Sequence, residues 1–488
     1  MWTVDLETSL YSHRAERLKR SGWIVLLVIF ELFLSPECKC QPNSCAVEWQ
    51  PQMQLSFDSV LAASPSLALD RSALHVTWYG IDTIGGLPFS GIQYSRTTDH
   101  GESFSPPRTI ADPASALLPG VLSASDGIVC ITSLGSFDGS FGLILYRSSD
   151  GGTTWDTPKP LLQNAAPNCM TAQDSSFYIN YTLLTNHTSG LLGSSDGGKI
   201  WTILSSTAPP LQSLVVTGNL FAGTGEYLSG SHNEIGFYYS PTQGDDWIGP
   251  QPVSTVDAVP STLSRLSVVG SHTIYVVWDD TGSIMLRKST ATDDNGDQIF
   301  SDITRLSDQH GAVFSSLASS GPYVVVAWDA DVNGTSSIRL RSSNNHAASF
   351  CPIDTPSTGT QPSAPCVVMD DSTIHLVWVE SIQGSGEILY RNGKLRHDLR
   401  PATFSLMQNF PNPAGGTTKI YYGVPIPEKV SLKLYNILGQ CVATLVDEIQ
   451  PAATYTVTVP TGGLASGVYF YRLVAYPFNE VRKLVVLH

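Results

Sequence analysis

The segment SSDGGTTW at residues 148–155 returns as SSDGGKIW at 194–201 and, more loosely, as TTDHGESF at 97–104. Each of these octads follows an apolar stretch, carries an aspartate two residues before a glycine and ends on an aromatic residue. Glycine favours tight turns because it adopts left-handed backbone conformations without penalty. Aspartate suits such turns because its carboxylate accepts hydrogen bonds from backbone amides a few residues ahead. The octads are therefore predicted to be hairpin turns.

The octads belong to a repeat of about 50 residues. Apolar strand cores begin at residues 74, 128, 177, 219, 274, 324 and 374, and most end on an aromatic residue or threonine. A second apolar strand follows most of these cores, and then comes an octad or its remnant. Four short strands at this period are typical of a β-propeller blade, because a small sheet buries its faces only by stacking on its neighbours.

The last repeat is incomplete. It stops at ILYRNG (388–393) and lacks both the octad and the outer strand. The segment VEWQPQMQLS (47–56) resembles the outer strand TTWDTPKPLL of residues 153–162. Propellers often complete the last blade with a strand from the opposite terminus, which removes an exposed edge. We therefore expect a propeller of six or seven blades, with seven favoured, over residues 46–393.

The octads resemble the Asp-box, also called the BNR repeat, of sialidases and related propellers. The residues that carry this resemblance are Thr97, Asp99, Gly101, Phe104, Ser148, Asp150, Gly152, Trp155, Ser194, Asp196, Gly198 and Trp201. Degraded copies lie at 240–247, 293–300 and 343–350. The resemblance implies an all-β, sialidase-like propeller in which these residues are structural and lie at the blade periphery.

A sialidase needs three arginines that grip a carboxylate, a tyrosine nucleophile with a glutamate partner, and an acid/base aspartate. Arg71 precedes the first octad but lacks the isoleucine and proline that follow the first arginine in that family. Recurrence at one position of the repeat indicates a structural role for the arginines at 96, 147, 287, 339, 341 and 391. The remaining candidates for ligand contact are Arg265, Glu226, Glu234 and Glu380. No catalytic set, metal site or cofactor site is predicted.

The charge of the chain argues against one class of partner. The chain has 488 residues with a net charge of −15, which disfavours a nucleic-acid partner. Basic residues before the apolar segment 22–35 indicate a signal peptide, so residues 1–45 are expected to be an export signal region, with an uncleaved anchor as the alternative. Removal of this region would leave no integral membrane domain.

In an oxidising compartment Cys351 could pair with Cys366, and Cys130 with Cys169, or these cysteines could be buried thiols.

A linker at 394–404 is followed by a second domain at 405–488. The sequence pattern of this domain predicts about seven short strands, enough for a small Ig-like β-sandwich. This stretch resembles the type A C-terminal sorting domain of the bacterial type IX secretion system. The segments that carry the resemblance are NFPNP (409–413), LYNILGQ (434–440), LASGVYFYRL (464–473) and RKLVVL (482–487), with the motif residues Asn409, Pro411, Asn412, Pro413, Gly439 and Gly467. Gly439 and Gly467 are expected where other residues would be strained.

The resemblance implies that residues 405–488 dock on the type IX secretion machinery. The body would then be released or displayed on the outer cell surface after passage through the periplasm. Three functions stay open for the propeller: binding a glycan or surface protein without catalysis, divergent exo-sialidase-type glycoside hydrolysis, and a structural spacer at the surface. A propeller fold alone does not choose among them.

Overall fold

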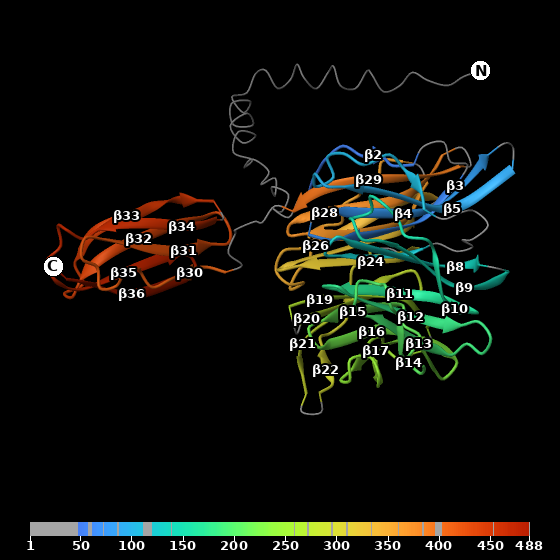
Figure 1. Cartoon of the computed structure of the whole chain (residues 1–488). Coiled ribbons are helices and arrows are strands. Elements are labelled where there is room, and N and C mark those ends of the chain that lie inside the picture. Colours follow the sequence, from blue (N-terminus) through green and yellow to red (C-terminus); the bar gives the residue numbers. More distant parts are fainter. Residues whose placement is uncertain are drawn as a thin grey trace, which may run out of the picture. The chain divides into compact units, whose positions relative to one another are not determined.

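The structure, a computed structural model, describes residues 47–56, 61–71, 73–84, 87–110, 120–137, 139–257, 259–270, 273–293, 296–308, 311–332, 334–359, 361–382, 385–395, 403–451 and 453–487. The chain divides into two compact units, Met1–Arg396 and His397–His488 (Figure 1). The predicted export signal region lies outside the described residues. In the described ranges no helix is long and apolar enough to cross a membrane.

The described part of the first unit consists of seven antiparallel sheets. The first three contain β3 (Leu61–Leu69), β4 (Leu74–Ile84), β5 (Leu87–Thr97) and β6 (Arg108–Thr109); β7 (Val121–Ser125), β8 (Ile128–Phe137), β9 (Ser140–Ser148) and β10 (Lys159–Gln163); and β11 (Ala165–Gln173), β12 (Ser176–Leu183), β13 (Ser189–Ser194) and β14 (Thr202–Ser205). The next two contain β15 (Ser213–Thr217), β16 (Leu220–Ser229), β17 (His232–Ser240) and β18 (Ile248–Pro252); and β19 (Ser261–Val269), β20 (Thr273–Asp280), β21 (Ile284–Thr292), β22 (Gln298–Phe300) and β23 (Thr304–Arg305). The last two contain β24 (Ala312–Ser320), β25 (Tyr323–Val332) and β26 (Thr335–Ser343); and β27 (Pro362–Asp370), β28 (Thr373–Ile382), β29 (Ser385–Leu395), β1 (Val47–Trp49) and β2 (Met53–Gln54).

The first strands of these sheets form a closed cycle. β3 contacts β7, and the contacts continue through β11, β15, β19, β24 and β27 back to β3. These strands are therefore innermost, and the later strands of each sheet lie progressively farther out. The prediction of an all-β propeller is confirmed.

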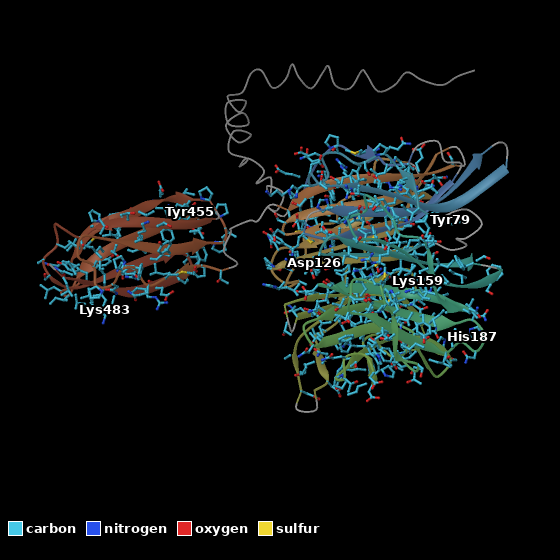
Figure 2. All side chains as sticks on the ribbon, viewed as in Figure 1. Tyr79, Asp126, Lys159, His187, Tyr455 and Lys483 are labelled. Atoms are coloured by element: carbon cyan, nitrogen blue, oxygen red, sulfur yellow. The ribbon has the colours of Figure 1, made fainter. Side chains whose placement is uncertain are left out.

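The second strand of each sheet is buried on both faces, because a neighbouring sheet covers each side. Residues 274–279 of β20 are all buried, and Trp278, Trp328 and Trp378 are among the largest fully buried side chains. A strand covered on both faces reads as a continuous apolar run rather than an alternating one. Figure 2 shows side chains filling the space between the stacked sheets.

The N-terminal end of the described chain completes the last sheet, as the sequence predicts. Strand β1 pairs antiparallel with β29, with Val47 opposite Leu395 and Trp49 opposite Gly393. In Figure 1 the blue and orange strands accordingly lie side by side. The indole of Trp49 donates a hydrogen bond of 2.7 Å to Asp354, and the guanidinium of Arg391 lies 5.5 Å from the centre of the Trp49 ring. These contacts fasten the closing strand beyond its backbone ladder.

The two suggested disulfide pairs are wrong. Cys130, Cys169 and Cys366 carry free thiols, whereas Cys351 is disulfide-bonded. Cys130 and Cys169 point into packed regions of the ring, and burial raises the pKa of each thiol to about 12. The alternative of buried thiols therefore holds for both.

The second unit is a two-sheet sandwich. One sheet contains β30 (Ser405–Leu406), β31 (Thr417–Val424) and β34 (Ala453–Pro460); the other contains β33 (Cys441–Gln450), β32 (Glu428–Asn436), β35 (Gly467–Ala475) and β36 (Phe478–Val486). Their inner faces share one apolar core that includes Ile420, Tyr422, Leu432, Tyr471 and Leu473. The seven strands match the number expected for this part of the chain.

The NFPNP segment is anchored by its two asparagines. The buried Asn409 side chain donates to Pro411 O at 3.1 Å and to Thr418 Oγ1 at 2.9 Å. The Asn412 carboxamide accepts from the Val485 amide at 2.9 Å, which ties the segment to β36. Gly439 has a left-handed φ of 78° in the turn after β32, as expected. Gly467 lacks a left-handed φ and a close neighbour, so the backbone role expected for it is wrong.

The closing strand supplies a stability test. Replacing Trp49 by alanine removes its hydrogen bond to Asp354 and its contact with Arg391. We expect the free energy of unfolding of the first unit to fall by about 2 kcal/mol, the scale of a lost hydrogen bond to a charged group plus apolar burial. Chemical denaturation followed by tryptophan fluorescence measures it. Gln50→Ala, which changes an exposed side chain directly after β1, is the control, and its free energy of unfolding should stay within about 0.5 kcal/mol of that of the unaltered chain. Equal effects of the two changes would contradict the anchoring role of Trp49.

Candidate functional site

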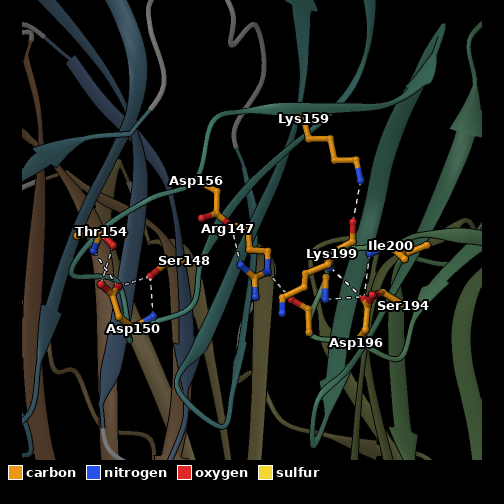
Figure 3. Close-up of polar contacts among 12 residues, drawn as sticks. Arg147, Ser148, Asp150, Thr154, Asp156, Lys159, Ser194, Asp196, Lys199 and Ile200 are labelled. Atoms are coloured by element: carbon orange, nitrogen blue, oxygen red, sulfur yellow. Dashed lines mark hydrogen bonds and ion pairs between the residues drawn. The ribbon is translucent and has the colours of Figure 1, made fainter.

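Each octad carboxylate accepts hydrogen bonds from groups of its own turn. Asp150 Oδ1 accepts hydrogen bonds from the amides of Thr153 at 3.0 Å and Thr154 at 2.8 Å, while Oδ2 accepts from Thr154 Oγ1 at 2.6 Å (Figure 3). Ser148 Oγ donates to the same carboxylate at 2.8 Å. These bonds, led by the Thr154 hydroxyl, hold the pKa of Asp150 well below its usual range. The carboxylate therefore stays ionised and is directed into the turn rather than toward a ligand.

The other two complete octads repeat this geometry. Asp196 accepts from the amides of Lys199 and Ile200 and from Ser194 Oγ, and Asp99 accepts from Ser103 and Thr97. The largest cause of the lowered pKa of Asp196 is the hydrogen bond from the Ile200 amide. For Asp99 the largest cause is the hydrogen bond from the Ser103 hydroxyl. The same arrangement on three successive sheets indicates a structural element, because a reacting group is expected at one place only.

The fifth residue of each octad packs against the preceding sheet. Gly152, with a left-handed φ of 83°, lies so close to the Tyr94 hydroxyl that a Cβ atom would overlap it. Gly101 meets Tyr390 in the same way, across the point where the ring closes. Only glycine combines this φ with this proximity. Each octad is therefore a contact between neighbouring sheets as well as a turn.

The fourth residue of each octad accepts a hydrogen bond from the sheet before it. Arg96 donates to Gly151 O, Arg147 to Gly197 O, and Asn392 to His100 O across the closure. Figure 3 shows Arg147 between the next octad and Asp156, to which it donates at 2.6 Å.

Later arginines also bind backbone oxygens. Arg287 donates to Val253 O at 2.7 Å, Arg341 to Leu306 O at 3.2 Å and Arg391 to Pro356 O at 2.7 Å, while Arg339 bonds Ser337 on its own strand. These side chains are engaged between or along the sheets. None of them lines the cavity described next, within the part of the chain that the structure describes.

A cavity of about 400 Å³ lies where three neighbouring innermost strands begin. It is lined by Asn168, Pro210, Leu211, Gln212, Glu226, Leu263 and Arg265. Asn168 lies near the start of β11, Gln212 directly precedes β15, and Arg265 follows an irregularity in the register of β19. Two of the residues selected from the sequence, Arg265 and Glu226, therefore meet in one cavity.

Among the described residues Arg265 is a charged group without a charged partner, and its side chain is exposed to solvent within the cavity. Desolvation by the surrounding protein lowers the pKa of the guanidinium, and the groups that oppose this are the thiols of Cys366 and Cys169, whose own pKa values burial raises. Protonated thiols do not neutralise a guanidinium. Among the described residues its only protein acceptor is Ser264 O at 2.9 Å.

The other polar groups of the cavity are held in place by a network. Glu226 accepts from Gln212 Nε2 at 2.5 Å, from the Leu263 amide at 3.3 Å and from Asn233 Nδ2 at 2.9 Å. Gln212 Oε1 in turn accepts from the amide and hydroxyl of Ser264. Glu226 is thus oriented by three donors and makes no ion pair with Arg265. Gln212 and Asn168 carry no sequence motif, and only the ring places them beside Arg265.

The remaining sequence candidates lie outside this cavity. Glu234 is fully buried and accepts from Ser254 Oγ at 2.6 Å. Glu380 is also buried and accepts from the Gln361 amide at 3.0 Å. Arg71 is 86% exposed, with Asp126 at 3.9 Å. These groups satisfy local structure or face solvent.

One titratable group was missed by the sequence analysis. Asp329, near the end of β25, accepts a hydrogen bond from the Ala364 amide, just as Glu226 accepts one from Leu263. Both amides belong to irregular, left-handed residues of the next innermost strand. Burial raises the pKa of Asp329 to about 6. Nothing in its local sequence distinguishes it from the turn aspartates. Across the described ranges, no three His, Cys, Asp or Glu side chains form a cluster that could hold a metal ion.

Comparison with known proteins identifies the second unit. Residues 408–487 match a family described as secretion system C-terminal sorting domain, which implies export to the cell surface or the extracellular space. A search of curated sequences finds no match to the chain.

Solved structures resemble the chain at low identity. A protein of unknown function from Dyadobacter fermentans is 14% identical, with a TM-score of 0.48 over 72% of this chain and 99% of that one. The phage phi92 endosialidase is 8% identical, with a TM-score of 0.44 over 90% and 88% of the two chains. The sialidase of Trypanosoma rangeli is 8% identical, with a TM-score of 0.38 over 87% and 83%. Likeness at this level carries no argument about activity.

The octad contact can be tested with a matched pair of glycines. Gly152 and Gly127 both have a left-handed φ, but only Gly152 has a neighbour that a Cβ would overlap. Gly127→Ala should cost about 1 kcal/mol of unfolding free energy from backbone strain alone. Gly152→Ala should cost about 2 kcal/mol more, because Tyr94 must also shift. Equilibrium denaturation measures both, and equal losses would show that the Tyr94 contact does not matter.

Acid should weaken the ring closure through His375. Burial lowers the pKa of this histidine from 6.5 to about 4, and its Nδ1 lies 2.7 Å from the Tyr390 hydroxyl. Between these two pH values the unfolded chain binds a proton that the folded chain does not, so stability decreases as the pH falls from about 6.5 to about 4. The melting temperature of His375→Gln should depend less on pH across this window than that of the unaltered chain. His232→Gln is the control; identical pH profiles for His375→Gln and the unaltered chain would refute the assignment.

Proposed function

We propose that the chain is a bacterial protein exported through the periplasm by a type IX secretion system, with a seven-bladed propeller that binds a glycan or protein ligand without catalysis. The match of residues 408–487 to a sorting domain supports export, and the seven sheets in a closed cycle support the blade number. We assign residues 46–393 to the propeller, 394–404 to a linker and 405–488 to the sorting domain that contacts the secretion machinery. The octad residues are assigned a structural role.

The cavity at Arg265 is the observation that carries the binding proposal. Arg265 is exposed in the cavity and has no anionic partner among the described residues, so its guanidinium is available to pair with a ligand carboxylate or sulfate. Arginine binds such groups through paired, charge-assisted hydrogen bonds. A volume of about 400 Å³ is within the range of small-ligand pockets. We therefore infer an anionic ligand, such as an acidic sugar or a peptide carboxylate, oriented by Gln212 and Asn168.

Glycoside hydrolysis of the sialidase type is the second candidate, because Glu226 lies in the same cavity as Arg265. Against it, Glu226 already accepts three hydrogen bonds and no tyrosine lines the cavity among the described residues. A nucleophile needs a base within hydrogen-bond reach, which this arrangement does not supply. The spacer hypothesis would hold if the cavity binds nothing.

The binding proposal is tested on the purified full chain with an array of acidic and neutral glycans. An acidic glycan that binds should bind at least about tenfold more weakly to Arg265→Ala, the scale of a lost charge-assisted hydrogen bond. Arg305→Ala, which removes an exposed arginine outside the cavity, is the control. Unaltered binding by Arg265→Ala would refute the assignment. A fluorogenic sialoside addresses the alternative: turnover that Glu226→Gln abolishes would establish hydrolysis instead.

A further inference from the structure

The second unit has apolar side chains on the outward face of its larger sheet. Along β35 the inward residues Tyr471 and Leu473 are fully buried, whereas Phe470 and Val474 point outward and are each 37% exposed. On the neighbouring strand β36, Val481 is 50% exposed. The outward face of a two-sheet sandwich is ordinarily polar, because only the inner faces are covered. This face therefore departs from the usual alternation.

The strand register gathers these residues into one surface, which we call the outer face. Phe470 lies between Tyr435 on β32 and Lys483 on β36. Arg472, two residues after Phe470 on β35 and so on the same face, lies between Lys433 on β32 and Val481 on β36. On β32, β35 and β36 the apolar and basic residues of the outer face include Tyr435, Val468, Phe470, Val474, Val481, Lys433, Arg472 and Lys483. Figure 2 shows Lys483 on the outside of this unit.

The turn after β32, at one end of the outer face, carries two further exposed apolar residues. Ile437 and Leu438 follow Tyr435 closely in sequence and are 72% and 77% exposed. The turn is already fixed by the side chain of Asn436, whose carboxamide accepts from the amides of Leu438 and Gln440 at 3.0 Å. Isoleucine and leucine are thus not needed to form it. Clustered exposed apolar residues on a soluble domain mark interaction sites.

The cations of the outer face outnumber its carboxylates. Of the nearby carboxylates in the described chain, Asp447 is the one on the same face; it forms an ion pair with Lys429 at 3.0 Å and also interacts electrostatically with Lys433. Arg472 donates to the neutral Asn479 side chain at 2.8 Å. A partner that fits must therefore offer an apolar patch bordered by carboxylates.

We propose that the outer face is the surface by which residues 405–488 dock on an outer-membrane component of the secretion machinery. This inference rests on the proposed export route. The outer face is built from β32, β35 and β36, which all fall within the residues that match the sorting-domain family. The sandwich core lies on the opposite side of this sheet, so a partner could contact the outer face without unfolding the sandwich.

Site-specific photo-crosslinking of the full chain in a type IX-competent bacterium tests the proposal. Benzoylphenylalanine at position 470 should crosslink to an outer-membrane component of the export machinery, identified by mass spectrometry. The same group at Ile426, an apolar residue 56% exposed in the turn before β32, is the matched control and should not. A crosslink from position 470 to the propeller of the same chain, to a second copy, or to no outer-membrane component would overturn the proposal.

Export assays give an independent measurement. The double variant Phe470→Ser, Val481→Ser should dock roughly tenfold more weakly, because central apolar anchors dominate most interfaces. It should therefore accumulate in the periplasm, while Ile426→Ser is exported like the unaltered chain. Unchanged melting temperatures of the purified variants would exclude misfolding as the cause. Normal export of the double variant would refute the outer face as the docking surface, whereas failure of the unaltered chain to be exported would instead refute the export route itself.

Discussion

The close approach between an octad glycine and a side chain of the preceding sheet is the contact on which the ring depends. Tyr94 meets Gly152, and Tyr390 meets Gly101, so the same contact operates within the ring and across its closure. Donors such as Arg96 and Asn392 add a hydrogen bond to the neighbouring residue of the same turn. Because sheets in a propeller touch only their neighbours, pairwise contacts of this kind set the spacing of the sheets that they join.

The sequence predicted the elements whose cause is local or repeated. The octad turns, the apolar second strands and the closing strand at 47–54 all follow from spacing, alternation and glycine placement. The sandwich strands follow from the same reasoning. Gly467 shows the limit of this approach, because a glycine in a motif need not occupy a left-handed conformation. The disulfide suggestions failed for a related reason: separation along the chain says nothing about which side chains point toward each other.

The cavity was only half predicted, and the reason is geometric. Arg265 stood out because it breaks the positional pattern of the other arginines, and Glu226 was one of three candidate carboxylates. Gln212 and Asn168 have no such signal, since each is ordinary in its own repeat. They become neighbours of Arg265 only because three innermost strands, about 50 residues apart in sequence, begin at one place. A site assembled from equivalent positions of successive repeats is visible only once the repeats are stacked.

The pairing of β1 with β29 also fixes the order in which the molecule can be completed. Val47 and Leu395 are opposite each other, so the first strand of the described chain cannot pair until nearly the last strand of the ring has been synthesised. Bringing such distant segments together in an otherwise unstructured chain would cost about 5 kcal/mol in loop entropy. Folding of the intervening sheets lowers this cost by holding the two ends close. The finished ring is thus a late event in synthesis, because its closure needs strands from both ends of the first unit.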